Sequence, residues 1–459
     1  MAQDSSLISP IDISSPATDR GGKLSMLSPA VRFSLVAFLV GILTGLTASA
    51  LKWSIVSVTK LLTSHLRVDG VDWPFLILPV IGILCAGIYQ RYILKHDISH
   101  GADKVTDFVK SGKSNLPPYM IYAPFLASTI TLGFGGSAGS EGPVATSGAA
   151  IGSNVARKLG MTPDEIRTMI CIGAGAGIAG IFKSPIGGAL FTIEVMDVSM
   201  SSSAIVSLII ATLTSALVAF VCSGMAPDIA FPDIQYINIG SIAWGAAAGL
   251  VCGIYSCYYS FIMKKLSTFF QSFNNQWLRN ISSGLVIAIG VFCFPSLYGE
   301  GYDVISKMLA GDPAAFLSRS VVWNEFGSYS VIFLMTLCVA LYKVFATAAT
   351  NCGGGVAGDF APTLFAGAVV GFLFTSIMKW IGIDLPVADC VMLCMAGVMA
   401  GTIKAPLMAM FLSMEMAMSF RLFLPVAIVT GVSYCVRIVL MHEFDHLRLK
   451  HNSTKSVKQ

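Results

Sequence analysis

Long apolar runs alternate with short polar or glycine-containing breaks along most of the chain. The first run begins at Phe33 and the last ends near Leu440. Several runs reach the ~20 residues that a helix needs to cross a bilayer, and others are clearly shorter. A helix that ends inside the membrane is tolerated where its end lines a cavity. The pattern therefore predicts an all-α integral membrane protein in which some helices are tilted and span only part of the bilayer.

Turn and cap signals divide the runs into segments. Thr162 and Glu165 form a capping box, which predicts a helix from Pro163 to about Ala179. The polar stretch 91–118 leaves room only for a short helix after Gly101. The other apolar segments are 73–89, 119–132, 144–159, 203–222, 238–263, 282–296, 328–349, 360–378, 387–400, 406–418 and 422–440.

Composition supports a membrane protein and excludes several other classes. The chain has 459 residues, of which 55% are hydrophobic and 12% charged, and its net charge is +4. The basic residues are spread over loops and ends, so no nucleic-acid partner is predicted. Most of the eleven cysteines lie in apolar segments, which is typical of buried free thiols. Cys390 and Cys394 are one helical turn apart but lack further ligands, so no metal and no cofactor is predicted.

The chain ends and the charge distribution predict an orientation. Residues 1–28 read as a disordered tail, and Arg20, Lys23 and Arg32 precede the first apolar run. Under the positive-inside rule the N-terminus is cytoplasmic, and we expect the C-terminus there too, in a multi-pass protein of the cell (plasma or inner) membrane. We expect membrane regions at 29–225 and 226–449 and a short cytoplasmic tail at 450–459.

One stretch, GGSAGSEGPVATSGAAIG at 135–152, sets an acidic residue among glycines. Pro143 suits the first turn of a helix that continues from Val144. The unpaired N–H groups and the positive dipole end of such a helix form an anion site. Glu141 lies at this helix start, where a carboxylate at membrane depth costs roughly 2.5 to 3.5 kcal/mol. Two interpretations remain: Glu141 is a helix cap, or it is a tethered competitor that leaves to let an anion or a proton pass.

The chain also contains an internal repeat. One set of residues recurs 221 positions later and another recurs 219 positions later. The first set is Gly180, Lys183, Pro185 and Glu194, matched by Gly401, Lys404, Pro406 and Glu415; the second is Gly139, Pro143, Gly148 and Gly152, matched by Gly358, Pro362, Gly367 and Gly371. In transporters, interrupted helices at matching positions of two halves indicate the binding site. The repeat therefore predicts that the helix starts near Pro143 and Pro362 converge.

Four motifs in order resemble the CLC family of chloride channels and chloride/proton antiporters. They are GSAGSEGP at 136–143, KSPIGGALFTIEV at 183–195, YGEGY at 298–302 and GGGVAGDFAP at 353–362, and the resemblance covers about residues 30–445. It implies a homodimer with one pore per subunit, built from two inverted repeats. It also implies that Glu141 is the gate and that anion sites are lined by Gly142, Pro143 and Val144 and by Asp359, Phe360 and Ala361. The short chain end after Leu449 leaves no room for CBS domains, which favours a prokaryotic form.

Three positions depart from the family pattern. Where many members have a serine that meets the central anion, this chain has His100, or Ser99 after a one-residue shift. His100 is either a surface residue or a pore-lining donor whose charge falls as pH rises. Val195 replaces the acid that takes protons from the inside in coupled members. Phe444 is the nearest match to the central tyrosine.

These features predict transport of chloride across a membrane, uncoupled or loosely coupled to protons because of Val195. A chloride/proton antiporter is the alternative, and a transporter of another small anion such as fluoride or nitrate is a second one. An intramembrane enzyme using Glu141 and His100 as acid and base is disfavoured, because no nucleophile or metal motif accompanies them. The expected partners are a small anion, protons, membrane lipid and a second copy of the chain. Glu194 and Glu415 are expected to be structural.

Overall fold

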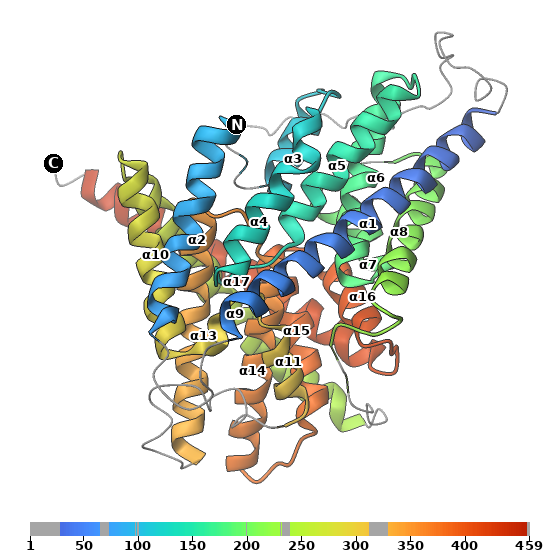
Figure 1. The fold of residues 1–459 in the computed structure, drawn as a ribbon. Helices are drawn as coiled ribbons and strands as arrows, with labels where there is room; N and C mark the ends of the chain where they lie inside the picture. The colour runs from blue at the N-terminus through green and yellow to red at the C-terminus, as the bar shows by residue number, and fades with distance from the viewer. Residues whose placement is uncertain are drawn as a thin grey trace.

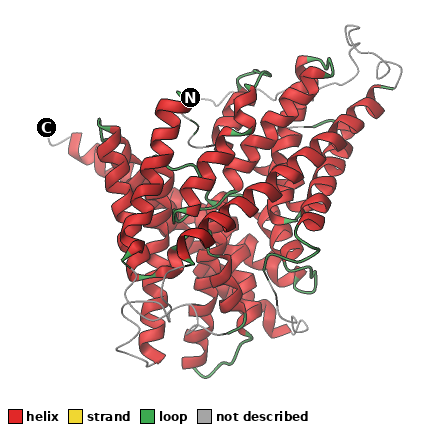
Figure 2. Cartoon of the chain, in the orientation of Figure 1, coloured by secondary structure: helices red, strands yellow, loops and turns green. Residues whose placement is uncertain are grey.

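The computed structural model describes residues 28–64, 73–96, 98, 101–198, 200–229, 231, 239–311 and 329–456. Within these ranges every regular element is a helix, as Figure 2 shows. Nine helices of the described chain are long and apolar enough to cross a membrane. Others, of 10–17 residues, are apolar but shorter. The predicted all-α membrane architecture with partly spanning helices is confirmed.

The helices of the first half are α1 (Pro29–Thr63), α2 (Pro74–Ile88), α3 (Gly101–Lys110), α4 (Ala123–Gly133), α5 (Glu141–Lys158), α6 (Pro163–Phe182), α7 (Pro185–Leu190) and α8 (Ser202–Cys222). π-Helical segments follow α2 at Tyr89–Leu94 and α7 at Phe191–Val195, and a 3-10 turn precedes α4 at Pro118–Ile121. α1 has 35 residues, about 50 Å of helix, which exceeds the ~30 Å hydrocarbon core. It therefore lies obliquely, as Figure 1 shows.

The second half contains α9 (Ile239–Gln271), α10 (Gln276–Cys293), the 3-10 turn Pro295–Leu297, α11 (Tyr302–Leu309), α13 (Tyr329–Cys352), α14 (Phe360–Trp380), α15 (Val387–Ile403), α16 (Pro406–Met416) and α17 (Phe423–Ser456). Its helix pairs repeat those of the first half. α5 packs on α6 as α14 packs on α15, and α1 packs on α8 as α9 packs on α17. The two halves predicted from the residue offsets are therefore structural equivalents.

The repeated glycines make the tight helix pairs possible. A β-carbon at Gly148 would overlap the carbonyl oxygen of Gly173 on α6, and one at Gly367 would overlap the Cys394 carbonyl on α15. One helical turn further along, a β-carbon at Gly152 would likewise overlap a carbonyl of α6, and one at Gly371 would overlap a carbonyl of α15. Backbone is therefore packed directly against backbone at matching points of the two halves, which is how small residues act between membrane helices.

Two glutamates tie the halves together reciprocally. The Glu194 carboxylate accepts the N–H groups of Leu407 (3.2 Å) and Met408 (2.7 Å) at the start of α16. Glu415, on α16, accepts those of Ile186 (3.0 Å) and Gly187 (2.9 Å) at the start of α7. Each acid thus caps the short helix of the other half, which bears out their expected structural role.

Several expected boundaries are confirmed and a few are corrected. α8, α13, α14 and α15 begin within one residue of the predicted starts, and the capping box at Thr162 is present. α10 begins at Gln276 rather than 282, because the Asn275 side chain accepts the Trp277 N–H (2.9 Å) and starts a polar first turn. α17 continues past 440 to Ser456, since no glycine or proline follows Gly431 to stop it. Apart from Ser28, the expected tail 1–28 lies outside the described residues.

Candidate functional site

The two helix starts singled out by the repeat meet deep in the protein. Gly139 precedes α5 and Gly358 precedes α14, and their backbones form a short antiparallel bridge. The Gly139 N–H donates to the Gly358 carbonyl over 2.9 Å, and the Gly358 N–H donates back over 2.7 Å. The two glycines are equivalent positions of the repeat, so the halves are joined at matching points. The predicted convergence of the two helix starts is confirmed.

Glu141 is the first residue of α5 and has no exposed surface. Its Oε1 accepts the Ala361 N–H over 2.7 Å, at the start of α14. Its Oε2 has no hydrogen-bond partner among the described residues. A β-carbon at Gly139 would overlap this carboxylate, and one at Gly358 would crowd it. The carboxylate therefore lies in a cradle that only glycines leave open, where positive helix ends favour an anion.

The α5 side offers fewer backbone donors than expected. Pro143 has no N–H to give, and the Val144 N–H donates to the Ser140 carbonyl over 3.1 Å within the first turn. Of the three residues expected to line an anion site here, Pro143 therefore has no N–H to offer and Val144 already uses its N–H within the helix. Gly142 is left as the candidate donor on this side.

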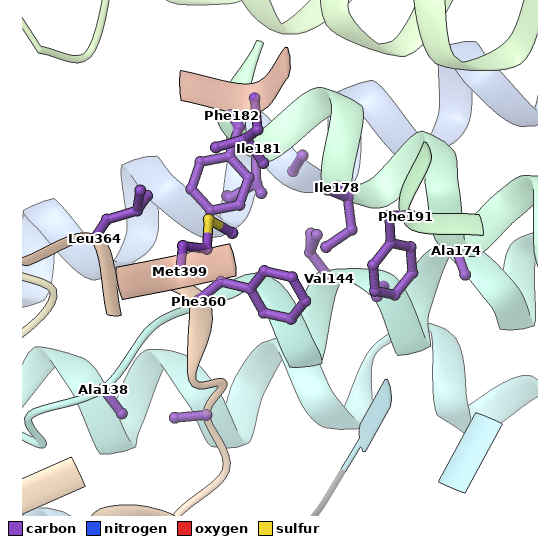
Figure 3. Packing of buried hydrophobic residues seen from close by; sticks show 14 of the residues in the cluster. Ala138, Val144, Ala174, Ile178, Ile181, Phe182, Phe191, Phe360, Leu364 and Met399 are labelled. Atoms are coloured by element: carbon purple, nitrogen blue, oxygen red, sulfur yellow. The ribbon is translucent and has the colours of Figure 1, made fainter. Parts of the chain in front are cut away.

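The start of α14 is apolar on one flank and polar on the other. Phe360, 6% exposed, packs edge-on against Phe191 with ring centroids 5.7 Å apart. Figure 3 shows the Phe360 ring pointing toward Val144 of α5. On the other flank Asp359 is the N-cap residue of α14, and its Oδ1 accepts from Asn351 Nδ2 over 2.5 Å. The helix start is thus held in place from both sides.

A buried lysine supports the loop that leads into α5. Lys343 is fully buried on α13; its Nζ donates to Ser137 Oγ over 2.9 Å and lies 4.6 Å from the centre of the Phe365 ring. Thr347 donates to the Ser137 carbonyl (2.9 Å), and Thr350 Oγ1 accepts the Ser137 N–H (3.1 Å). Positions 343, 347 and 350 lie on one helical face. That face therefore anchors the loop and places a lysine amine beside it.

A second carboxylate caps α5 from another part of the chain. Glu300, between the Pro295–Leu297 turn and α11, is 8% exposed. Its Oε1 accepts both the N–H and the hydroxyl of Ser140, over 3.0 and 2.5 Å. Ser140 is the N-cap residue of α5 and immediately precedes Glu141.

Sequence reasoning missed the roles of both Glu300 and Lys343. Lys343 lies in a segment interpreted only as apolar, although a lone lysine inside such a segment is itself a signal. Glu300 lies in the quoted YGEGY motif, where its contact with a residue 160 positions earlier cannot be inferred from local pattern.

The remaining candidates are placed only in part. Val195 ends the π-helical segment after α7, and it packs against the apolar core without any acid at its position. Ser99 and His100 lie outside the described residues. Phe444 lies within α17, but its side chain is not among those described. Among the described residues no group of three or more His, Cys, Asp or Glu could hold a metal ion.

Most of the chain, including the bridge and the cradle, matches a known family. Residues 81–437 match the family described as "Voltage gated chloride channel". The chain belongs to this family. The chain is thus a multi-pass membrane protein of an anion-transport family, which is not a class of catalytic enzymes.

Relatives of this family member carry both channel and exchanger names. A putative chloride channel protein, ClcB-like, from Ralstonia nicotianae is 27% identical over 369 residues, which cover 78% of this chain and 82% of the relative. The H(+)/Cl(−) exchange transporter ClcA of Vibrio vulnificus is 25% identical over 433 residues, covering 90% and 88%. An X-ray structure of a slow cyanobacterial Cl⁻/H⁺ antiporter superposes with a TM-score of 0.75 at 20% identity, over 90% of this chain and 95% of that one. The expected CLC-type fold is therefore confirmed.

Proposed function

We propose that this protein conducts chloride across a membrane and that Glu141 opens and closes the pathway. The observation that carries the proposal is the 2.7 Å hydrogen bond from the Ala361 N–H to Glu141 Oε1, at the point where two helix starts meet. A free anion in the same place needs the same donor. Glu141 and the anion therefore compete, and protonation of the carboxylate removes the competitor.

Backbone amides and helix ends replace part of the anion's hydration shell along this pathway. On the α5 side we assign this role to Gly142, and on the α14 side to Asp359, Phe360 and Ala361 through their main chain. Ser99 or His100, and Phe444, are proposed to line the central part. Binding stays weak enough for release because, within the described part of the chain, the hydrogen bond to the carboxylate that marks the site comes from a neutral backbone N–H.

We further propose that anion flux is uncoupled from protons or only loosely coupled. The physical ground is Val195, which cannot carry a proton at the position that takes protons from the inside in coupled members. A chloride/proton antiporter is the second candidate, because a 25% identical relative is named as an H(+)/Cl(−) exchange transporter.

Assembly and orientation complete the proposal. We propose a homodimer with one pathway per subunit, with both termini cytoplasmic in the cell membrane and a boundary between repeats near residue 225. The faces of α8 and α16 suit a dimer contact, since Ile205, Ile209 and Leu407 are 38%, 51% and 52% exposed. Failure of paired cysteines at these positions to crosslink two subunits would contradict the dimer face.

The decisive experiment compares the protein with Glu141→Gln in chloride-loaded liposomes, with and without a proton gradient. Glutamine is neutral at every pH, so we expect chloride efflux at neutral pH to rise on the order of tenfold, because the interaction of a carboxylate with helix ends is worth up to ~2 kcal/mol. Efflux of the variant should also lose the part of the pH dependence that titration of Glu141 causes, whereas wild-type efflux rises as pH falls. Identical pH profiles for the two proteins would overturn the gate.

The same vesicles separate the transport modes and anions. A wild-type reversal potential at the chloride Nernst value, without proton movement, establishes uncoupled flux. A reversal potential that shifts with the pH gradient establishes antiport and contradicts the argument from Val195. Competition with fluoride, bromide and nitrate then decides whether chloride is the preferred anion.

A further inference from the structure

Glu300 holds the residue directly before the gate. Its Oε1 accepts two hydrogen bonds from Ser140, one from the backbone N–H at 3.0 Å and one from the hydroxyl at 2.5 Å. A helix start prefers an anion at this place, and the usual source is a side chain of the helix or its N-cap. Here Ser140 makes no cap of its own, and the carboxylate comes from a loop near α11. Glu300 therefore brings a second negative charge to the start of α5.

Glu300 also lines a cavity that opens on one face of the molecule. The cavity has a volume of about 740 Å³ and is lined by residues of α1, the 298–302 loop and α11. Lys60, Asp303 and Lys307 line the same cavity and are themselves exposed, so the cavity opens to the surface. Lys60 lies near the Thr63 end of α1, and the cavity therefore opens on the side opposite the start of that helix. Figure 1 shows α11 on this side, next to α14.

Both acidic and basic residues lie around Glu300. Glu141 and Lys343 lie in the interior, where Lys343 is bonded to the loop leading into α5. Tyr302, two residues further along in the same motif, has the Lys52 ammonium 4.6 Å from its ring centre, and Lys52 is itself paired with Asp228 over 2.7 Å. Asp359 lies at the start of α14. The charged residues that line the cavity are Lys60, Glu300, Asp303 and Lys307. Of these four, Glu300 accepts the backbone N–H of Ser140, the residue beside Glu141.

We infer that Glu300 is a positioning residue that sets the pH at which the Glu141 gate opens. Its carboxylate is hydrogen-bonded to Ser140, the residue directly before Glu141, and this negative charge disfavours a second one on Glu141. The neutral, open form of the gate therefore persists to higher pH than Glu141 alone would allow. Because Glu300 faces a cavity open to one side, solution conditions on that side reach it. The inference deepens the proposed function and rests on it.

Glu300→Gln tests the charge without removing the hydrogen-bond acceptor. Glutamine keeps an oxygen for both Ser140 donors, so the cap survives and only the charge is lost. With equal pH on both sides of the vesicle, we expect the pH of half-maximal chloride efflux to fall by about one unit, while maximal efflux at low pH stays the same. Glu300→Asp keeps the charge, so it should shift the midpoint less than Glu300→Gln does.

Two further proteins separate this role from a structural one. Asp303→Asn removes an acid from the same cavity that contacts neither Ser140 nor Glu141, and it should leave the midpoint unchanged. In the Glu141→Gln background, adding Glu300→Gln should produce no pH shift, because no titrating gate remains. A midpoint unmoved by Glu300→Gln, or a shift that persists without Glu141, would overturn the inference while the gate itself stands. Failure of the gate would appear separately, as a Glu141→Gln variant with the wild-type pH profile.

Discussion

The starts of α5 and α14 occupy equivalent positions in the two halves, yet they carry different side chains. Glu141 opens α5, whereas Phe360 opens α14, and the preceding residues are Ser140 and Asp359. Each start is preceded by a glycine, Gly139 before α5 and Gly358 before α14, and these two glycines form the central bridge. The scaffold is therefore symmetric, while the charge and the aromatic ring are not.

Because of this difference, the two helix starts are held in place in different ways. The α14 side is fixed by packing, since the Phe360 ring lies against Phe191 and Asp359 is bonded to Asn351. The α5 side carries a carboxylate with one hydrogen bond to the Ala361 N–H and one oxygen without a partner in the described chain. A group held by a single hydrogen bond can leave, and a group held by packing cannot. The asymmetry thus assigns the moving part to the first half and the fixed donors to the second.

The largest expected effect comes from exchanging each opening residue for alanine. Phe360→Ala removes a buried ring and should lower the free energy of unfolding by about 3 to 5 kcal/mol. Glu141→Ala removes a buried carboxylate with an unsatisfied oxygen, so it should change that free energy by less than about 1 kcal/mol. Equilibrium unfolding in detergent measures both. Equal losses for the two variants would contradict the division into a fixed and a moving helix start.

Much of the symmetric scaffold can be predicted from the sequence, because glycine and proline act locally. Gly139 and Gly358 mark the bridge, and Gly148 and Gly367 mark the close helix pairs, since each position excludes a β-carbon. The asymmetric partners are harder to predict. Glu300 and Lys343 reach the α5 start from 160 and 206 residues away, through contacts that only the assembled fold creates.

Some errors have simple physical causes. Pro143 ends the family motif and Val144 follows it, but Pro143 lacks an N–H and Val144 uses its N–H in the first turn, so the resemblance alone overstates the donors. α10 begins before the apolar run predicted at 282 because its first turn contains polar residues. The prediction that Glu194 and Glu415 are structural is confirmed, since each accepts two backbone N–H groups at a helix start.

An intermediate effect tests the symmetric part of the comparison. Gly148→Ala and Gly367→Ala each place a methyl group against a backbone carbonyl on the neighbouring helix. Overpacking of this kind costs about 1 to 3 kcal/mol, and the two variants should lose similar amounts because the geometry repeats. Gly431→Ala on α17 is the matched control, as nothing lies within 4 Å of its added carbon. It should stabilise the protein slightly, by up to about 1 kcal/mol, through helix propensity. Loss of stability in the control would show that glycine itself, rather than close packing, matters.

The smallest expected effect concerns the reciprocal caps of α7 and α16. Glu194→Gln leaves one of two backbone N–H groups facing an amide nitrogen and should cost about 1 kcal/mol. Glu415→Gln should cost more, about 2 kcal/mol, because Glu415 also accepts the Ser184 hydroxyl besides two N–H groups. The double variant should lose the sum, since the acids cap different helices and share no donor. Thermal unfolding of the four proteins in one detergent measures this order. A larger loss for Glu194→Gln than for Glu415→Gln would contradict the assignment of the difference to the additional hydrogen bond from Ser184.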